Sequence, residues 1–62
     1  MAMPQLVEID YEQHKEEADT DKAYLFVING EDEWVPKSLC EIDSDSRQIT
    51  VPRWFAKNNG FI

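Results

Sequence analysis

The chain has few of the residues on which small stapled, metal-binding or catalytic domains depend: its 62 residues include one cysteine, one histidine and two glycines. The lone cysteine, Cys40, excludes an internal disulfide. Because secreted domains of this size usually need several disulfides, we expect a reducing cytoplasm. Two glycines, Gly30 and Gly60, are too few for a loop that cradles phosphate. No cysteine–histidine spacing suggests zinc.

Long apolar runs and an N-terminal targeting signal are missing as well. The longest apolar run, residues 23–28, has six residues and is far too short to span a bilayer. The N-terminus lacks the basic region and the apolar run of a signal peptide. We therefore expect a soluble protein without a membrane partner.

Basic residues are scarce, with six against thirteen acidic residues and a formal net charge of −7. All thirteen acids fall between Glu8 and Asp45, where three lysines leave a charge of 3 − 13 = −10. The residues from Ser46 onward carry three basic residues and no acid, hence +3. A surface this negative repels nucleic acid and anionic membranes and attracts basic partners.

The chain does contain enough apolar residues for the core of one small domain. Its residues are 42% hydrophobic and include seven aromatics, too many for a wholly disordered chain. The apolar residues gather in residues 22–62, which we expect to form most of the fold, whereas residues 1–21 form an acidic N-terminal segment. A domain of this size buries only about 60% of its unfolded surface, so a partner chain or self-association would help its core.

Alternation of apolar and acidic residues predicts an edge strand at residues 5–11 of the N-terminal segment. Its apolar members are Val7, Ile9 and Tyr11. Residues 13–21 are almost entirely polar or charged, and no structure is predicted for them.

Residues 22–28 are the clearest strand, because they are rich in aromatic and β-branched residues. They run into Asn29-Gly30, a dipeptide typical of the type I′ turn of a hairpin. We expect the return strand to begin near Glu33 and to be interrupted at Pro36, which cannot donate to a ladder. Pairing should then resume over residues 38–42.

The sequence pattern of the C-terminal third predicts a turn, a strand and a helix. Residues 43–46 are turn formers, residues 48–51 alternate, and Pro52 fits the start of a helix over residues 53–59 that Gly60 closes. The fold class we predict is α+β: a small antiparallel meander of three strands, or four with residues 5–11, and one short C-terminal helix. Trp54 and Phe55 should pack this helix on the sheet.

No motif points to catalysis or to a metal. His14 is the only histidine, and nothing in the sequence relates it to Cys40 or Ser38 as a base to a nucleophile. The carboxylates at 43 and 45 alternate as in calcium loops but lack the glycine and the downstream glutamate of an EF-hand. We predict a non-enzymatic protein with no metal and no cofactor.

Two kinds of binding surface remain. Tyr24, Phe26 and Trp34 lie on neighbouring predicted strands and would form a base-stacking platform if they shared a face. That depends on the turn: a two-residue turn pairs Trp34 with Leu25, and a three-residue turn pairs it with Phe26. A core position is the stronger interpretation for these rings, because so small a domain needs them inside.

The acidic half is the better lead, because carboxylates on one face would imitate nucleic-acid phosphates and occupy a basic groove on a nucleic-acid-handling protein. An acidic surface that serves solubility alone is the other interpretation. Trp34 is added as an anchor, since tryptophan is enriched at interface hot spots. The predicted partner-binding residues are Glu8, Asp10, Glu12, Glu31, Asp32, Glu33 and Trp34.

Residues 22–62 carry a wider resemblance through Trp34-Val35-Pro36-Lys37-Ser38, the acidic turn and Pro52-Arg53-Trp54. This part of the chain resembles small acidic proteins encoded by bacteriophages and prophages. The resemblance implies a phage or bacterial origin, hence a bacterial host cytoplasm, and a fold, but it carries no activity that can be transferred to this chain. Small phage proteins of this kind often bind and redirect a host protein, and the acidic charge agrees with a role in binding or inhibiting one. Two alternatives stay open: an accessory protein of phage replication or recombination that contacts single-stranded nucleic acid, and a structural homo-oligomer.

Overall fold

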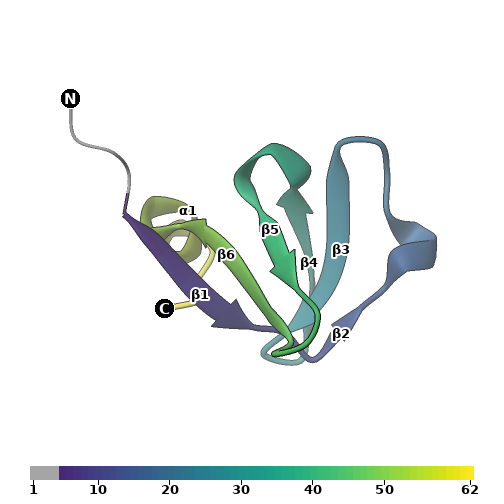
Figure 1. Ribbon diagram of the computed structural model, residues 1–62, viewed down its shortest axis with the longest axis horizontal. Coiled ribbons are helices and arrows are strands. Elements are labelled where there is room, and N and C mark those ends of the chain that lie inside the picture. The colour runs from purple at the N-terminus through teal and green to yellow at the C-terminus, as the bar shows by residue number, and fades with distance from the viewer. Residues whose placement is uncertain (1–4) are drawn as a thin grey trace.

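The computed structural model describes residues 5–62, so the first four residues of the predicted segment 1–21 lie outside it (Figure 1). Antiparallel strands form two three-stranded sheets, and a short helix follows the last strand. The elements are β1 (Leu6–Asp10), β2 (Gln13–His14), β3 (Ala23–Ile28), β4 (Glu31–Pro36), β5 (Glu41–Asp43), β6 (Gln48–Pro52) and α1 (Arg53–Asn58), with 3₁₀ turns at Glu16–Ala18 and Lys37–Leu39. The predicted α+β class, with small antiparallel strands and one short C-terminal helix, is confirmed.

The strands are divided between two sheets instead of running on as one meander. The first sheet has the order β1-β6-β5 and the second the order β2-β3-β4. The chain crosses between them at two adjacent residues: the Tyr11 N–H donates to the Arg47 carbonyl, just before β6 of the first sheet, and the Glu12 N–H donates to the Val27 carbonyl of the second. Both sheets therefore meet where β1 ends.

The hairpin of the second sheet uses the two-residue turn. Ile28 pairs with Glu31, and Asn29 and Gly30 both have positive φ, 53° and 78°, as a type I′ turn requires. The return strand thus begins at Glu31, two residues before the predicted start near Glu33. This register places Trp34 opposite Leu25.

The prediction that pairing with the hairpin resumes over residues 38–42 is wrong. β4 ends at Pro36, and the Lys37 N–H still donates to the Lys22 carbonyl at 2.8 Å. Lys37–Leu39 then forms a 3₁₀ turn, which redirects the chain so that β5 pairs with β6. The 3₁₀ turn, and not the proline, therefore ends the pairing with the hairpin, because the last bond to the β3 side of the hairpin lies one residue beyond Pro36.

Residues 12–21 are tied to the second sheet although sequence alone predicted no structure for residues 13–21. His14 pairs with Phe26, and the Lys15 N–H donates to the Leu25 carbonyl at 2.8 Å. A 3₁₀ turn at Glu16–Ala18 leads back, and the Thr20 N–H donates to the Ala23 carbonyl.

One core joins the two sheets and the helix. Phe55 and Ala56 are the buried residues of α1, which contacts β1 and β6. Trp54 was predicted to pack on the sheet, but it is 52% exposed, because the helix turns its Phe55–Ala56 side inward. The fully buried large side chains come from both sheets: Phe26, Ile28, Val35, Ile49 and Val51.

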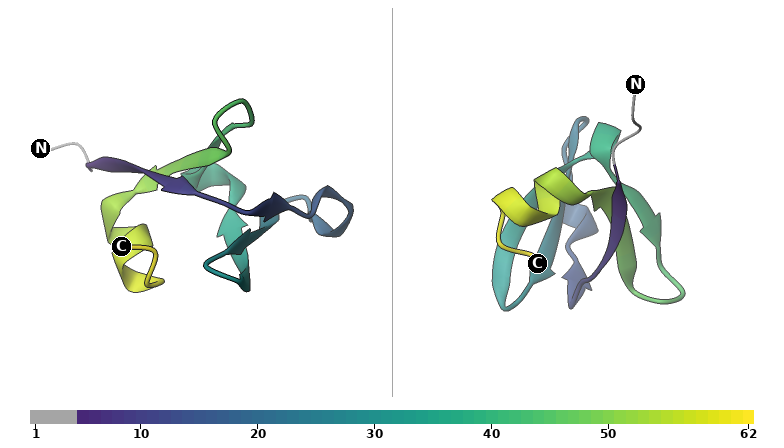
Figure 2. Two further views of the ribbon diagram at one scale, coloured as in Figure 1. Left: turned by 90° about the horizontal axis from the view of Figure 1, so that it is seen from below. Right: turned by 90° about the vertical axis from the view of Figure 1, so that its left-hand side faces the viewer.

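The helix and the hairpin lie on the same side of the first sheet. In Figure 2 (left), α1 and the β3–β4 hairpin both extend from one side of β1 and β6. The isoleucines of this sheet face that side and are buried or half-buried, namely Ile9, Ile42 and Ile49. Within residues 5–62, the acidic residues on the opposite side of this sheet are exposed.

Candidate protein-binding face

Two copies of one tripeptide contribute the exposed acidic residues of the first sheet. Glu-Ile-Asp occurs at residues 8–10 in β1 and at residues 41–43 in β5, and β6 lies between these two strands. Both tripeptides have the same register against β6, since Ile9 and Ile42 pair with the same residue, Ile49. Side chains alternate along a strand, so the three isoleucines turn inward and the acids outward.

The acids therefore form two rows across the sheet. In one row Glu8 and Glu41 flank Thr50, and in the other Asp10 and Asp43 flank Gln48. Strand geometry separates the rows by about 7 Å and the two carboxylates of a row by about 10 Å at the backbone. All four acids are exposed. We call this surface the acidic face and define it by Glu8, Asp10, Glu41 and Asp43.

Short polar contacts hold one of the two rows in place. The Gln48 side-chain amide donates to Asp10 Oδ1 at 2.9 Å. Asp43 Oδ1 accepts from the N–H groups of Asp45 and Ser46 at 3.2 and 3.4 Å, as in an Asx turn. No lysine, arginine or histidine forms a salt bridge with any of the four carboxylates within residues 5–62. No basic side chain within residues 5–62 therefore offsets the charge of this face.

The other predicted acids are spread over two sides of β4. Asp32 pairs with Lys15 at 2.9 Å, which offsets its charge. Glu31 and Glu33 alternate with it and point to the other side, where Glu33 is half-buried opposite Phe26. Glu31, Asp32 and Glu33, three of the predicted partner-binding residues, thus occupy strand positions and do not share one surface.

Glu12 has a structural contact of its own. Its Oε1 accepts the N–H of Gly30 at 2.8 Å and so fastens the segment after β1 to the turn of the β3–β4 hairpin. Asp10 and Asn29 line a common depression beside it, so this turn lies next to the end of β1. A carboxylate already engaged with backbone is less available to a partner than those of the acidic face.

The three rings proposed as a base-stacking platform are not on one exposed surface. Phe26 is fully buried, and its ring lies 4.8 Å from that of Tyr11 between ring centroids. Tyr24 is on the same side and half-buried, with Lys37 Nζ 5.1 Å from its ring centroid. Trp34 is 52% exposed on the opposite side of the sheet, since it pairs with Leu25.

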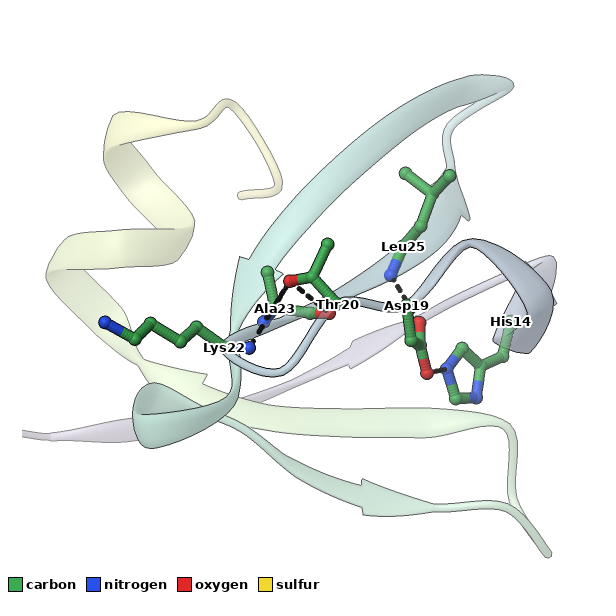
Figure 3. A network of polar contacts seen from close by, with 6 residues as sticks. All are labelled: His14, Asp19, Thr20, Lys22, Ala23 and Leu25. Carbon is green, nitrogen blue, oxygen red and sulfur yellow. Dashed lines mark hydrogen bonds and ion pairs between the residues drawn. The ribbon is translucent and has the colours of Figure 1, made fainter.

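His14 belongs to a polar network that orders the connection between β2 and β3 (Figure 3). Its Nε2 lies 2.8 Å from Asp19 Oδ2, and Asp19 Oδ1 accepts the Leu25 N–H at 2.9 Å. Burial by itself would raise the pKa of Asp19, but the Leu25 N–H and the His14 ring outweigh it and lower this pKa below its ordinary value. The histidine is thus a structural partner of Asp19.

Cys40 does not have the environment of a nucleophile. Burial and the nearby charge of Glu41 raise the pKa of its thiol to about 11, which disfavours the reactive thiolate. Within residues 5–62, no three histidine, cysteine, aspartate or glutamate side chains are grouped so that they could hold a metal ion. The same part of the chain has no helix long and apolar enough to cross a bilayer.

Sequence reasoning found Glu8 and Asp10 but missed Glu41 and Asp43, which complete the acidic face. The signal was present, because residues 41–43 repeat residues 8–10 and share their alternation. Alternation alone does not tell which strands are neighbours, and that information came from the pairing of both with β6.

No protein-family model, curated protein or solved structure matches this chain. The resemblance to small acidic phage proteins therefore stays a prediction.

Proposed function

We propose that the protein is a non-enzymatic binding module that presents its acidic face to a basic region of another protein. One observation carries the proposal: two Glu-Ile-Asp tripeptides lie in the same register on either side of β6 and bring four exposed carboxylates onto one surface. Like charges gathered on one face repel each other, and the carboxylates of Glu8 and Glu41 have no hydrogen bond or salt bridge within residues 5–62 to offset this repulsion. Binding to a basic partner would offset this repulsion and would give the carboxylates a function.

The negative charge and the resemblance to phage proteins favour a host protein that handles nucleic acid as the partner. The binding groove of such a protein is basic, and an array of carboxylates competes for it as phosphates do. In this form of the proposal the protein acts as an inhibitor that mimics nucleic acid. Direct binding of single-stranded nucleic acid has less support, because Phe26 is buried and Trp34 lies on the other side of its sheet.

Affinity capture with a matched pair of variants tests the proposal. The tagged protein, the variant Glu8→Lys/Glu41→Lys and the variant Glu16→Lys/Glu17→Lys are each incubated with nuclease-treated bacterial lysate. Both variants change the net charge equally, but Glu16 and Glu17 are exposed residues of the 3₁₀ turn after β2. Bound proteins are released with rising salt and identified by mass spectrometry.

We expect one dominant basic protein that the parent chain and the Glu16/Glu17 variant retain and the Glu8/Glu41 variant loses. Its release by salt would reflect the charge contacts. Equal retention by both variants would show that the acidic face is not the binding surface. The parent chain is also incubated with untreated lysate, and proteins captured there but not from nuclease-treated lysate would point to nucleic acid instead.

A further inference from the structure

The acidic face ends in an apolar depression near the start of β1. The depression is open, has a volume of about 430 Å³, and contains residues from β1, the 3₁₀ turn before β5, and β6. Leu6 lies at its side and is 60% exposed, although most leucines of small domains are needed inside. Its apolar lining is formed by Leu6, Leu39, Cys40 and Pro52.

The depression continues the rows of the acidic face. Leu6 pairs with Pro52, one row beyond the row of Glu8, Thr50 and Glu41. Glu41 and Thr50 line the depression themselves, so the apolar and acidic parts are contiguous. Along the strands the apolar row lies about 7 Å from the first pair of carboxylates and about 14 Å from the second.

We infer that this combined surface binds a peptide segment of a basic protein that inserts one apolar side chain into the depression and places lysine or arginine side chains on the two acidic rows. The inference rests on the proposed function and names the chemistry that the partner must have. Charge complementarity selects the occupant, because carboxylates on one side of an apolar recess reject acidic or purely apolar segments.

One positive charge lines the depression as well, and its position agrees with this occupant. Lys37 contributes to the wall, but its Nζ lies 5.1 Å from the ring centroid of Tyr24, a typical cation–π distance. The ammonium group is thereby held at Tyr24. Glu8 and Glu41 keep no basic partner within residues 5–62, so they remain free for the lysine or arginine of a ligand.

Two labelled peptides test the inference by fluorescence anisotropy at low and high salt. One carries a single leucine flanked on each side by two lysines, and the other is identical except that asparagine replaces the leucine. Burying a leucine side chain is worth enough for about a tenfold difference in affinity. We therefore expect the leucine peptide to bind about ten times more tightly, and both peptides to bind more weakly in high salt.

Matched variants locate the contact. Leu6→Asn removes the apolar side chain at the depression, and Trp54→Asn removes a similarly exposed one (52% against 60%) on the helix. Circular dichroism and a urea titration establish that both variants are folded under the conditions of the binding measurement. The preference for the leucine peptide should vanish in Leu6→Asn and persist in Trp54→Asn, as a double-mutant cycle would show.

Other outcomes separate this inference from the proposed function. If both peptides bind equally and Glu8→Gln/Glu41→Gln weakens both, the acidic face binds basic segments but the depression takes no anchor, and the inference is overturned alone. If neither peptide binds at low salt, both proposals fail. If light scattering shows a dimer that Leu6→Asn dissociates, the depression holds a second copy of the chain and the inference is wrong.

Discussion

At the scale of single residues, Asp19 connects two strands of the second sheet although the sequence did not single it out. One of its carboxylate oxygens faces the ring of His14, and the other accepts the Leu25 N–H of β3. The side chain is only 16% exposed, so water replaces these bonds poorly. The carboxylate fixes the turn between β2 and β3, and its charge is part of that function.

We predict that Asp19→Asn lowers the free energy of unfolding by about 1 kcal/mol at neutral pH, because it removes a charge-assisted contact to His14 while keeping an acceptor for Leu25. The pKa of Asp19 lies below its ordinary value of 3.8, so its ionised form stabilises the fold fully above that pH. The difference from the parent should shrink as the pH falls from about 4 through the lowered pKa. Urea titrations across acidic pH measure it.

Asp21→Asn is the control, since Asp21 is an exposed neighbour on the same connection. It should leave the free energy of unfolding almost unchanged at every pH. A pH-independent loss in Asp19→Asn would mean that the charge of Asp19 does not contribute and that only shape matters at this position.

At the scale of elements, a residue outside the β3–β4 hairpin helps to fix the position of the hairpin. The Asn29–Gly30 turn fixes its register locally, and Glu12 then fastens that turn to the end of β1 through the Gly30 N–H. This contact spans the point where the chain leaves the first sheet for the second. A residue predicted to bind a partner therefore joins the two sheets.

Truncation of Glu12 should show this role. We expect Glu12→Ala to lower the free energy of unfolding by about 0.5–1 kcal/mol, since one exposed hydrogen bond is lost, and Glu12→Gln to lose less because its oxygen still accepts. Chemical denaturation monitored by tryptophan fluorescence gives both values. Glu16→Ala, at an exposed residue of the 3₁₀ turn, serves as control, and an equal effect of both alanine variants would contradict the role of Glu12.

At the scale of the whole molecule, the two sheets share one core. Phe26, Ile28 and Val35 of the second sheet belong to the same buried cluster as Ile49 and Val51 of the first. Phe55 and Ala56 of the helix complete the cluster. Each sheet contributes only part of this cluster, so we expect neither to persist without the other in a chain of this length.

The shared core predicts one cooperative unfolding transition, which the two tryptophans can test. Trp34 lies on β4 of the second sheet and Trp54 on α1, which packs on the first, and each is 52% exposed. The variants Trp34→Phe and Trp54→Phe leave one reporter on each part at little cost in stability. After correction for any small shift between variants, their urea transitions should coincide with each other and with circular dichroism. Transitions that differ between probes would show that the sheets unfold separately.

The sequence by itself determined the features that depend on neighbouring residues. Asn29-Gly30 tolerates positive φ at two successive positions, and the turn at this dipeptide has two residues. Alternation produced β1, and Pro52 is followed by a short helix. Asp43 accepts hydrogen bonds from its own turn. Each of these signals acts over a few residues, so no distant partner is required to read it.

Only the tertiary structure decided which strands became neighbours and which side chains share a surface. β5 could have continued the hairpin, but it pairs with β6, and this choice brings Glu41 and Asp43 beside Glu8 and Asp10. It also leaves Trp54 outside while Phe55 closes the core. Pairing between distant segments depends on the burial that the whole chain achieves at once, and the local pattern of charge and hydrophobicity does not encode it.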